Sequence, residues 1–164
     1  MRSTEPLARA MTRWFGRDAA RVQHFLKVWA FARMIGRRER LEEEQLFVLE
    51  SAALAHDIGI KTAEARYHSC AGHYQEELGP EDARPMLEEL GYTPEETERI
   101  CWLIGHHHTY GLDGGLDYQI LLEADFLVNA YEDELSPAAL RSFRDNVFRT
   151  ESGRKLLQQI YGIA

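Results

Sequence analysis

The segment from Ser51 to Lys61, SAALAHDIGIK, constrains the fold most strongly, because an apolar run of small residues ends in a histidine and an aspartate. Residues 52–55 predict a tightly packed helix. A carboxylate at the end of such a helix is costly to bury unless a partner compensates its charge. A divalent cation would satisfy the pair His56-Asp57, so further metal ligands are expected elsewhere in the chain.

Apolar residues recur at helical spacing through most of the chain, and no run shows the alternation typical of a strand. Asp18 is expected to cap one helix, and Thr93 with Glu96 forms the capping-box pattern at the start of another. The sequence therefore predicts one all-α domain, divided into an N-terminal helical extension (1–17), a metal-site core (18–133) and C-terminal helices (134–164). The expected helices lie in or near residues 1–17, 18–35, 41–56, 79–91, 93–105, 118–131, 136–147 and 151–161. Residues 58–72 are expected to form a loop that can include a short turn of helix.

Composition and charge narrow the class of protein. A chain of 164 residues can bury one sizeable hydrophobic core. The net charge of −8 argues against binding to a nucleic acid polymer, which requires a basic face. The two cysteines, Cys70 and Cys101, cannot form a disulfide framework and lack the spacing of a structural zinc site. Because no segment approaches the roughly 20 apolar residues of a membrane span, we expect a cytoplasmic protein with no membrane partner.

Four residues with metal-binding side chains lie on or beside the apolar faces of the expected helices: His24, His56, Asp57 and Asp125. Their apolar neighbours direct them toward the interior, where each polar group needs a partner. Two imidazoles and two carboxylates form a mixed nitrogen and oxygen set, which accepts Mn²⁺, Fe²⁺, Co²⁺, Ni²⁺, Zn²⁺ or Mg²⁺. Four protein ligands would leave positions open for water and a phosphate oxygen.

The order His … His-Asp … Asp, the tetrapeptide HDIG and the context LLEADFLVN around Asp125 together resemble the HD-domain superfamily of metal-dependent phosphohydrolases. The resemblance covers roughly residues 21–128. It implies a compact helical bundle with the metal site between core helices. It further implies that His24 is the first ligand, His56 and Asp57 the central doublet, and Asp125 the closing ligand. The implied activity is the attack of a metal-activated water on a small phosphomonoester or phosphodiester, with a nucleotide as the expected substrate.

Two-metal members of this superfamily share the doublet aspartate between both ions and hold the second ion with additional histidines. The candidates here are His73 and the run of three histidines at 106–108. His106 and His107 are favoured over His108: His107 follows the apolar face of Ile100 and Leu103, and His106 aligns with this face less cleanly. These side chains would hold a second metal or contact phosphate. Asp57 and Lys61 are the expected catalytic residues, with Lys61 contacting phosphate or protonating the leaving group. The number of ions, one or two, stays open.

Two subgroups of the superfamily fit less well. Guanosine tetraphosphate hydrolases carry acidic residues three and four positions after the doublet aspartate, where this chain has Ile60 and Lys61. Cyclic-dinucleotide phosphodiesterases carry Gly-Tyr-Pro after a histidine pair, where this chain reads HHHTYGLDGG. The alternatives are a di-iron oxygenase that uses O₂ to cleave C–C or C–P bonds, and a non-catalytic nucleotide-binding or regulatory module. Assembly into a homo-oligomer also stays open.

Overall fold

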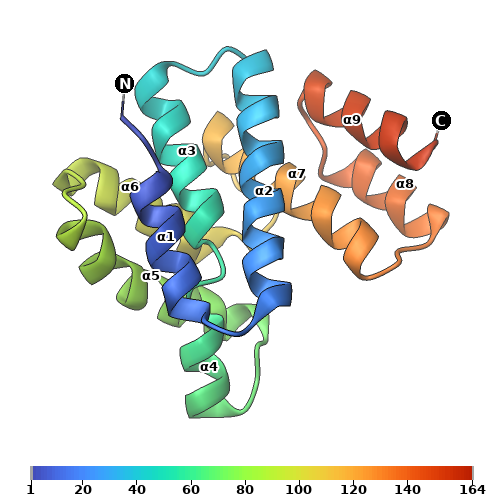
Figure 1. The fold of residues 1–164 in the computed structure, drawn as a ribbon. Coiled ribbons are helices and arrows are strands. Elements are labelled where there is room, and N and C mark those ends of the chain that lie inside the picture. Colours follow the sequence, from blue (N-terminus) through green and yellow to red (C-terminus); the bar gives the residue numbers. More distant parts are fainter. Residues whose placement is uncertain (1, 164) are drawn as a thin grey trace.

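A computed structural model describes residues 2–163, which form nine α-helices and no strand (Figure 1). The all-α expectation is confirmed for this part of the chain. The helices are α1 Glu5–Phe15, α2 Ala19–Arg38, α3 Glu43–Ala55, α4 Ile60–Tyr67, α5 Gly72–Glu89, α6 Pro94–His106, α7 Leu116–Glu132, α8 Pro137–Asn146 and α9 Glu151–Tyr161.

The core lies where α2, α3 and α7 pack against one another. Figure 1 shows α2 beside α3, with α5 and α6 on one side of this centre and the α8–α9 pair on the other. Phe25 and Val28 of α2, Leu49 of α3 and Leu121 of α7 are fully buried at these contacts. Burial of such side chains is the main favourable contribution to folding, at roughly 1.5–3 kcal/mol each. The packing also brings together three helices that carry predicted ligands.

The predicted helix starts at Asp18 and Thr93 are confirmed. The Asp18 carboxylate accepts a hydrogen bond from the backbone N–H of Arg21, at 3.2 Å. At α6, Thr93 and Glu96 make both bonds of the capping box, each side chain accepting from the other residue's backbone N–H. Both caps satisfy N–H groups that have no partner inside the helix.

The segment between α3 and α6 differs from the prediction. Residues 60–67 form a helix of eight residues, longer than the short helical turn that the sequence allowed within this loop. Helix α5 begins at Gly72 and continues through Pro80. Proline inside a helix removes one backbone hydrogen bond. Buried packing offsets that loss: Leu78 is fully buried, and Gly79 lies directly against Gly59, the residue before α4, and against Ile104 of α6. The helix start predicted at Gly79-Pro80 is therefore wrong.

Helix α1 covers the outside of the HDIG turn. Leu7, Met11 and Phe15 are buried, and Trp14 Nε1 donates a hydrogen bond to the backbone oxygen of Ile58 at 3.0 Å. The N-terminal helix thus packs on the same turn that presents the His-Asp doublet.

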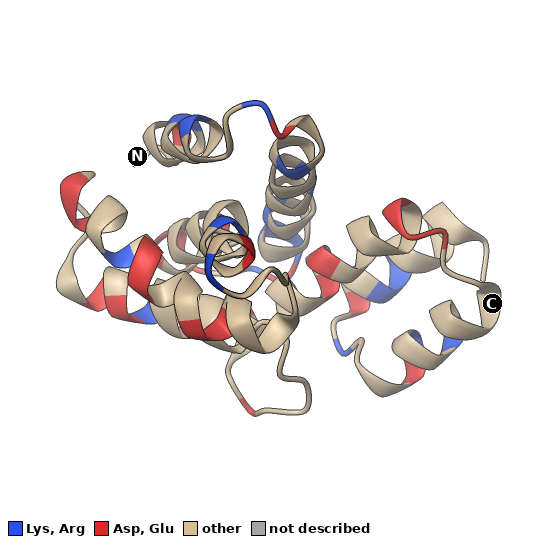
Figure 2. Ribbon diagram, turned by 90° about the horizontal axis from the view of Figure 1, so that it is seen from below, with Lys and Arg blue, Asp and Glu red and all other residues tan. Residues whose placement is uncertain are grey.

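Acidic and basic residues are interspersed along the helices, as Figure 2 shows. Among residues 2–163, no helix combines the length and apolar character needed to cross a membrane.

Candidate metal centre

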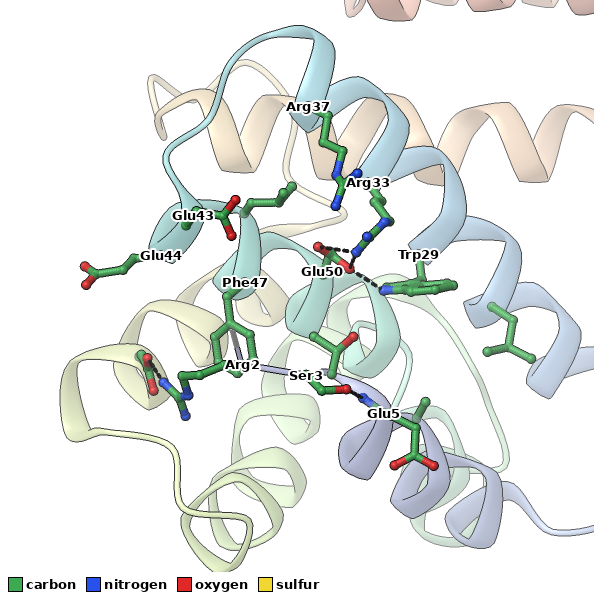
Figure 3. A pocket seen from close by; sticks show the side chains of 15 residues that line it. Arg2, Ser3, Glu5, Trp29, Arg33, Arg37, Glu43, Glu44, Phe47 and Glu50 are labelled. Carbon is green, nitrogen blue, oxygen red and sulfur yellow. Dashed lines mark hydrogen bonds and ion pairs between the residues drawn. The ribbon is translucent and has the colours of Figure 1, made fainter.

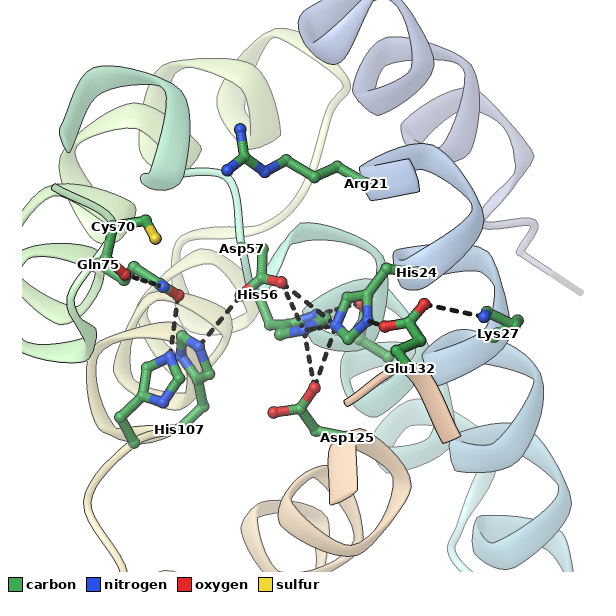
Figure 4. Close-up of polar contacts among 12 residues, drawn as sticks. Arg21, His24, Lys27, His56, Asp57, Cys70, Gln75, His107, Asp125 and Glu132 are labelled. Carbon is green, nitrogen blue, oxygen red and sulfur yellow. Dashed lines mark hydrogen bonds and ion pairs between the residues drawn. The ribbon is translucent and has the colours of Figure 1, made fainter. Parts of the chain in front are cut away.

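Four side chains from three elements converge at one point between α2, α3 and α7 (Figure 4). His24 Nε2 lies 3.2 Å from His56 Nε2, 3.1 Å from Asp125 Oδ1 and 3.3 Å from Asp57 Oδ2. His56 Nε2 lies 3.3 Å from the same oxygen of Asp57 and 3.3 Å from the same oxygen of Asp125. The structure thus brings together the four ligands predicted from the sequence.

Hydrogen bonds at Nδ1 orient both imidazoles of this set. His56 Nδ1 donates to the backbone oxygen of Ala53 at 2.7 Å. His24 Nδ1 donates to Glu132 Oε1 at 2.6 Å, and the second oxygen of Glu132 accepts from Lys27 Nζ at 2.8 Å. Because Nδ1 of each ring is bound to an acceptor, Nε2 of each ring faces the cluster, which is the orientation that metal-binding histidines require.

A second group of donors shares the Asp57 carboxylate. His107 Nε2 lies 3.4 Å from Asp57 Oδ1, is buried and has no hydrogen-bond partner, while its Nδ1 donates to the oxygen of Ile104 at 2.6 Å. Potential ligand atoms of Asp57, His107 and His108 all lie within 4.8 Å of one another. His108 Nε2 donates to Gln75 Oε1 at 2.9 Å. A buried, unpartnered nitrogen facing a carboxylate is the feature that a second cation would satisfy.

Charges within the cluster shift the ionisation of its members. Burial lowers the pKa of His24, but hydrogen bonds to Asp125 and Asp57 outweigh it and raise the pKa to about 10. The same carboxylates raise the pKa of His56 against its complete burial. Burial raises the pKa values of Asp57 and Asp125, yet the positive charge of His56 and hydrogen bonds from the histidines bring both well below the usual range. The carboxylates thus need a positive charge beside them, and a divalent cation bound to neutral imidazoles would supply it.

His106 does not reach the cluster. Helix α6 continues through this residue, so its ring stacks on Trp102 with centroids 4.2 Å apart and its Nδ1 donates to the oxygen of Trp102. The helix ends there, and the next two residues turn toward Asp57. The geometry therefore corrects the preference for His106 over His108, because the end of the helix changes the direction of successive side chains.

His73 and Lys61 also lie outside the cluster. The ring of His73 packs against the neighbouring Tyr74, with centroids 3.9 Å apart. Lys61 Nζ donates to the backbone oxygen of Trp14 at 2.9 Å and lies 5.1 Å from the centroid of its ring. Neither residue lines the cavity beside the cluster. The catalytic role expected for Lys61 has no geometric support, because its ammonium group is held by α1.

The sequence reasoning missed Glu132 and Lys27. Glu132 follows Asp125 by two helical turns on α7, so both carboxylates lie on one face of that helix. Lys27 follows His24 by three residues on α2, which also places the pair on one face. Both spacings can be read from the sequence once the ligands are named.

The cluster opens into a cavity of about 650 Å³, whose lining includes His24, Asp57, His108 and Asp125. A larger cavity of about 880 Å³ lies between α1, α2 and α3 (Figure 3). There the buried Glu50 accepts hydrogen bonds from Trp29 and Arg33, both at 2.9 Å, so its charge is already compensated. The smaller cavity therefore holds the candidate site, because His24, Asp57, His108 and Asp125 of the two donor groups line it.

Replacing Glu132 with alanine is expected to weaken metal binding by about 10- to 100-fold, the range typical of residues that orient a ligand. The substitution frees Nδ1 of His24 and removes the carboxylate that holds its ring. Calorimetric titration of the metal-free protein with Mn²⁺ measures the change. Glu81→Ala, an exposed glutamate on α5, is the matched control. Wild-type affinity in Glu132→Ala would contradict the orienting role.

The comparisons with known proteins agree with this geometry. The model of the HD domain family matches residues 21–139. The structure is similar to that of a predicted HD superfamily hydrolase from an uncultured Thermotogales bacterium, with a TM-score of 0.69 and 26% identity over 96% of this chain and 84% of that chain. A comparison with curated protein sequences gave no significant match. Since the family match spans most of the chain and includes all four converging residues, the protein belongs to the HD-domain family.

Proposed function

We propose that the protein is a metal-dependent phosphohydrolase that cleaves a small phosphomonoester or phosphodiester, with a nucleotide as the expected substrate. The observation that carries this proposal is the convergence of two imidazoles and two carboxylates: Nε2 of His24 and Nε2 of His56 each lie 3.1–3.3 Å from the other and from one oxygen of each carboxylate. Membership in the HD-domain family and the similarity to a predicted hydrolase support hydrolysis as the reaction class.

A divalent cation held by His24, His56, Asp57 and Asp125 would acidify a water molecule and offset the charge of a phosphoryl group. The protein's own residues prepare the site for this chemistry. Backbone and Glu132 acceptors keep the two imidazoles in the ligating orientation. His107 directs an unpartnered Nε2 at Asp57 from inside the protein, where it can hold a proton or a second cation. Burial of these groups strengthens their electrostatic interactions relative to water.

The test combines metal analysis with a screen of phosphate release from phosphomonoesters and phosphodiesters. We expect activity that is lost on treatment with EDTA and restored by a divalent cation. His56→Ala should lose both the bound metal and the activity, whereas His73→Ala, a histidine outside the cluster, should keep both. Unchanged metal content and activity in His56→Ala would refute the proposal.

A di-iron oxygenase is the competing function, because the second donor group, Asp57 with His107 and His108, could hold a second metal ion. Two irons per chain, with O₂ consumption and no phosphate release, would assign the protein to that class. A protein that purified without metal and bound a nucleotide without turnover would instead be a regulatory module. Either result would replace the hydrolase proposal.

A further inference from the structure

The cavity beside the metal centre has room for more than a phosphoryl group. Its volume of about 650 Å³ falls within the roughly 300–1,000 Å³ typical of small-molecule sites. Beyond the ligands, its wall includes Gln23 and Lys27 of α2, Asn129 of α7 and Asp133, the residue that directly follows α7. These residues would face the organic part of a substrate whose phosphoryl group lies at the ligands.

The cationic side chains of this wall are already paired with carboxylates. Arg21 binds Asp18 at 3.1 Å and also forms an ion pair with Glu64. Lys27 Nζ lies 2.8 Å from Glu132, and Figure 4 shows it directed at that carboxylate. A substrate phosphate that recruited either cation would have to break an existing ion pair.

The groups that remain uncommitted are neutral or negative. Among the described residues, the Asp133 carboxylate has no ion-pair or hydrogen-bond partner. The side-chain amides of Gln23 and Asn129 also have no hydrogen-bond partner within the described part of the chain. Asp133 is exposed and lies at the end of α7. A carboxylate repels additional phosphates, whereas amides and a carboxylate can bind hydroxyl and amide groups of an uncharged molecule.

We propose that the cavity selects a phosphomonoester with one phosphoryl group and a neutral, hydroxylated remainder over substrates that carry a chain of phosphates. The inference rests on the proposed function and narrows its substrate class. Hydrolysis then adds water across the P–O ester bond: the water oxygen joins phosphorus as the bond to the ester oxygen breaks, and the ester oxygen takes up the proton that water releases and departs as a hydroxyl. Each additional phosphate would meet Asp133 without a free cation to offset its charge.

The first test compares kcat/KM of the Mn²⁺-loaded protein for AMP, ADP and ATP, measured by phosphate release. AMP is expected to be the best of the three substrates, with a kcat/KM about tenfold higher than that of ATP. The additional phosphates of ATP are negatively charged and would lie close to the Asp133 carboxylate, which repels them. Asp133→Asn should raise the ratio of kcat/KM for ATP to kcat/KM for AMP by about 3- to 10-fold. Asp113→Asn makes the same charge change outside the cavity lining and should leave the ratio as in wild type.

The second test concerns the amides. Asn129→Ala should raise KM for AMP with little change in kcat, and should leave phenyl phosphate unaffected because its ring offers no hydrogen-bonding group. Gln158→Ala, an exposed amide on α9, is the control. Two results would overturn the inference without refuting the phosphohydrolase function. The first is a kcat/KM for ATP equal to that for AMP. The second is an Asp133→Asn variant whose ratio of kcat/KM for ATP to that for AMP equals the wild-type ratio. If the metal-loaded protein cleaves none of these compounds, the proposed function fails and the inference fails with it.

Discussion

Replacing Asp57 with alanine is expected to abolish metal binding and to reduce phosphoester hydrolysis by about 1,000-fold or more. This exceeds the roughly 10- to 100-fold loss typical of residues that only orient a ligand. One oxygen of Asp57 lies 3.3 Å from Nε2 of both His24 and His56, and the other lies 3.4 Å from Nε2 of His107. A single substitution therefore removes the group that both sets of donors share. Metal content after dialysis and kcat/KM on the best substrate measure the two losses.

Asp57→Asn separates charge from shape, because the amide keeps the size of the side chain and one acceptor oxygen. We expect it to lose most of the metal affinity while keeping the far-UV circular dichroism of the wild type. The exposed Asp113→Asn should retain metal and activity. A folded Asp57→Ala that binds metal with wild-type affinity would remove Asp57 from the centre.

The sequence predicts the core of the site because each ligand has a helical position relative to apolar residues. His24 precedes the buried Val28 by one turn, and Asp125 lies between Leu121 and Val128 on α7. Packing of α2, α3 and α7 along these apolar faces necessarily brings the polar groups together. For this reason the family and the all-α class follow from the sequence and are confirmed.

Contacts between segments distant in sequence, and the point at which a helix ends, could not be predicted in this way. Local periodicity does not reveal that Trp14 binds the oxygen of Ile58, or that this packing draws Lys61 toward α1. The choice among residues 106–108 depends on the end of α6, and helix boundaries are the least certain part of any pattern-based prediction. Pro80 has the sequence pattern of a helix start, but in the structure α5 continues through it because tertiary packing stabilises the helix there.

Replacing Gly59 with alanine is expected to lower the free energy of unfolding by about 2–3 kcal/mol, as overpacking of a close contact does. A Cβ atom at this position would lie 2.7 Å from the backbone N of Gly79 and 3.0 Å from the backbone O of Gln75. Both atoms belong to the backbone of α5, so no flexible side chain can move aside. For a chain of this size the loss corresponds to a fall in Tm of about 5–10 °C, measurable by thermal denaturation.

Gly105→Ala is the matched control, because its Cβ would meet Pro80 Cγ at an ordinary 3.4 Å, and alanine in a helix usually adds about 0.4–1 kcal/mol of stability. The two substitutions should therefore shift Tm in opposite directions. A wild-type Tm in Gly59→Ala would contradict the close contact between Gly59 and α5.

The Gly59 substitution should also weaken metal binding, because α5 carries both acceptors that hold His108. Gln75 Oε1 lies 2.9 Å from His108 Nε2, and Glu76 Oε2 accepts from the backbone N–H of His108 at 3.2 Å. A displaced α5 would carry these acceptors away from His108 and loosen its position beside Asp57. Metal affinity should then fall together with Tm. A lower Tm with unchanged metal affinity would show that α5 stabilises the fold without positioning the second donor group.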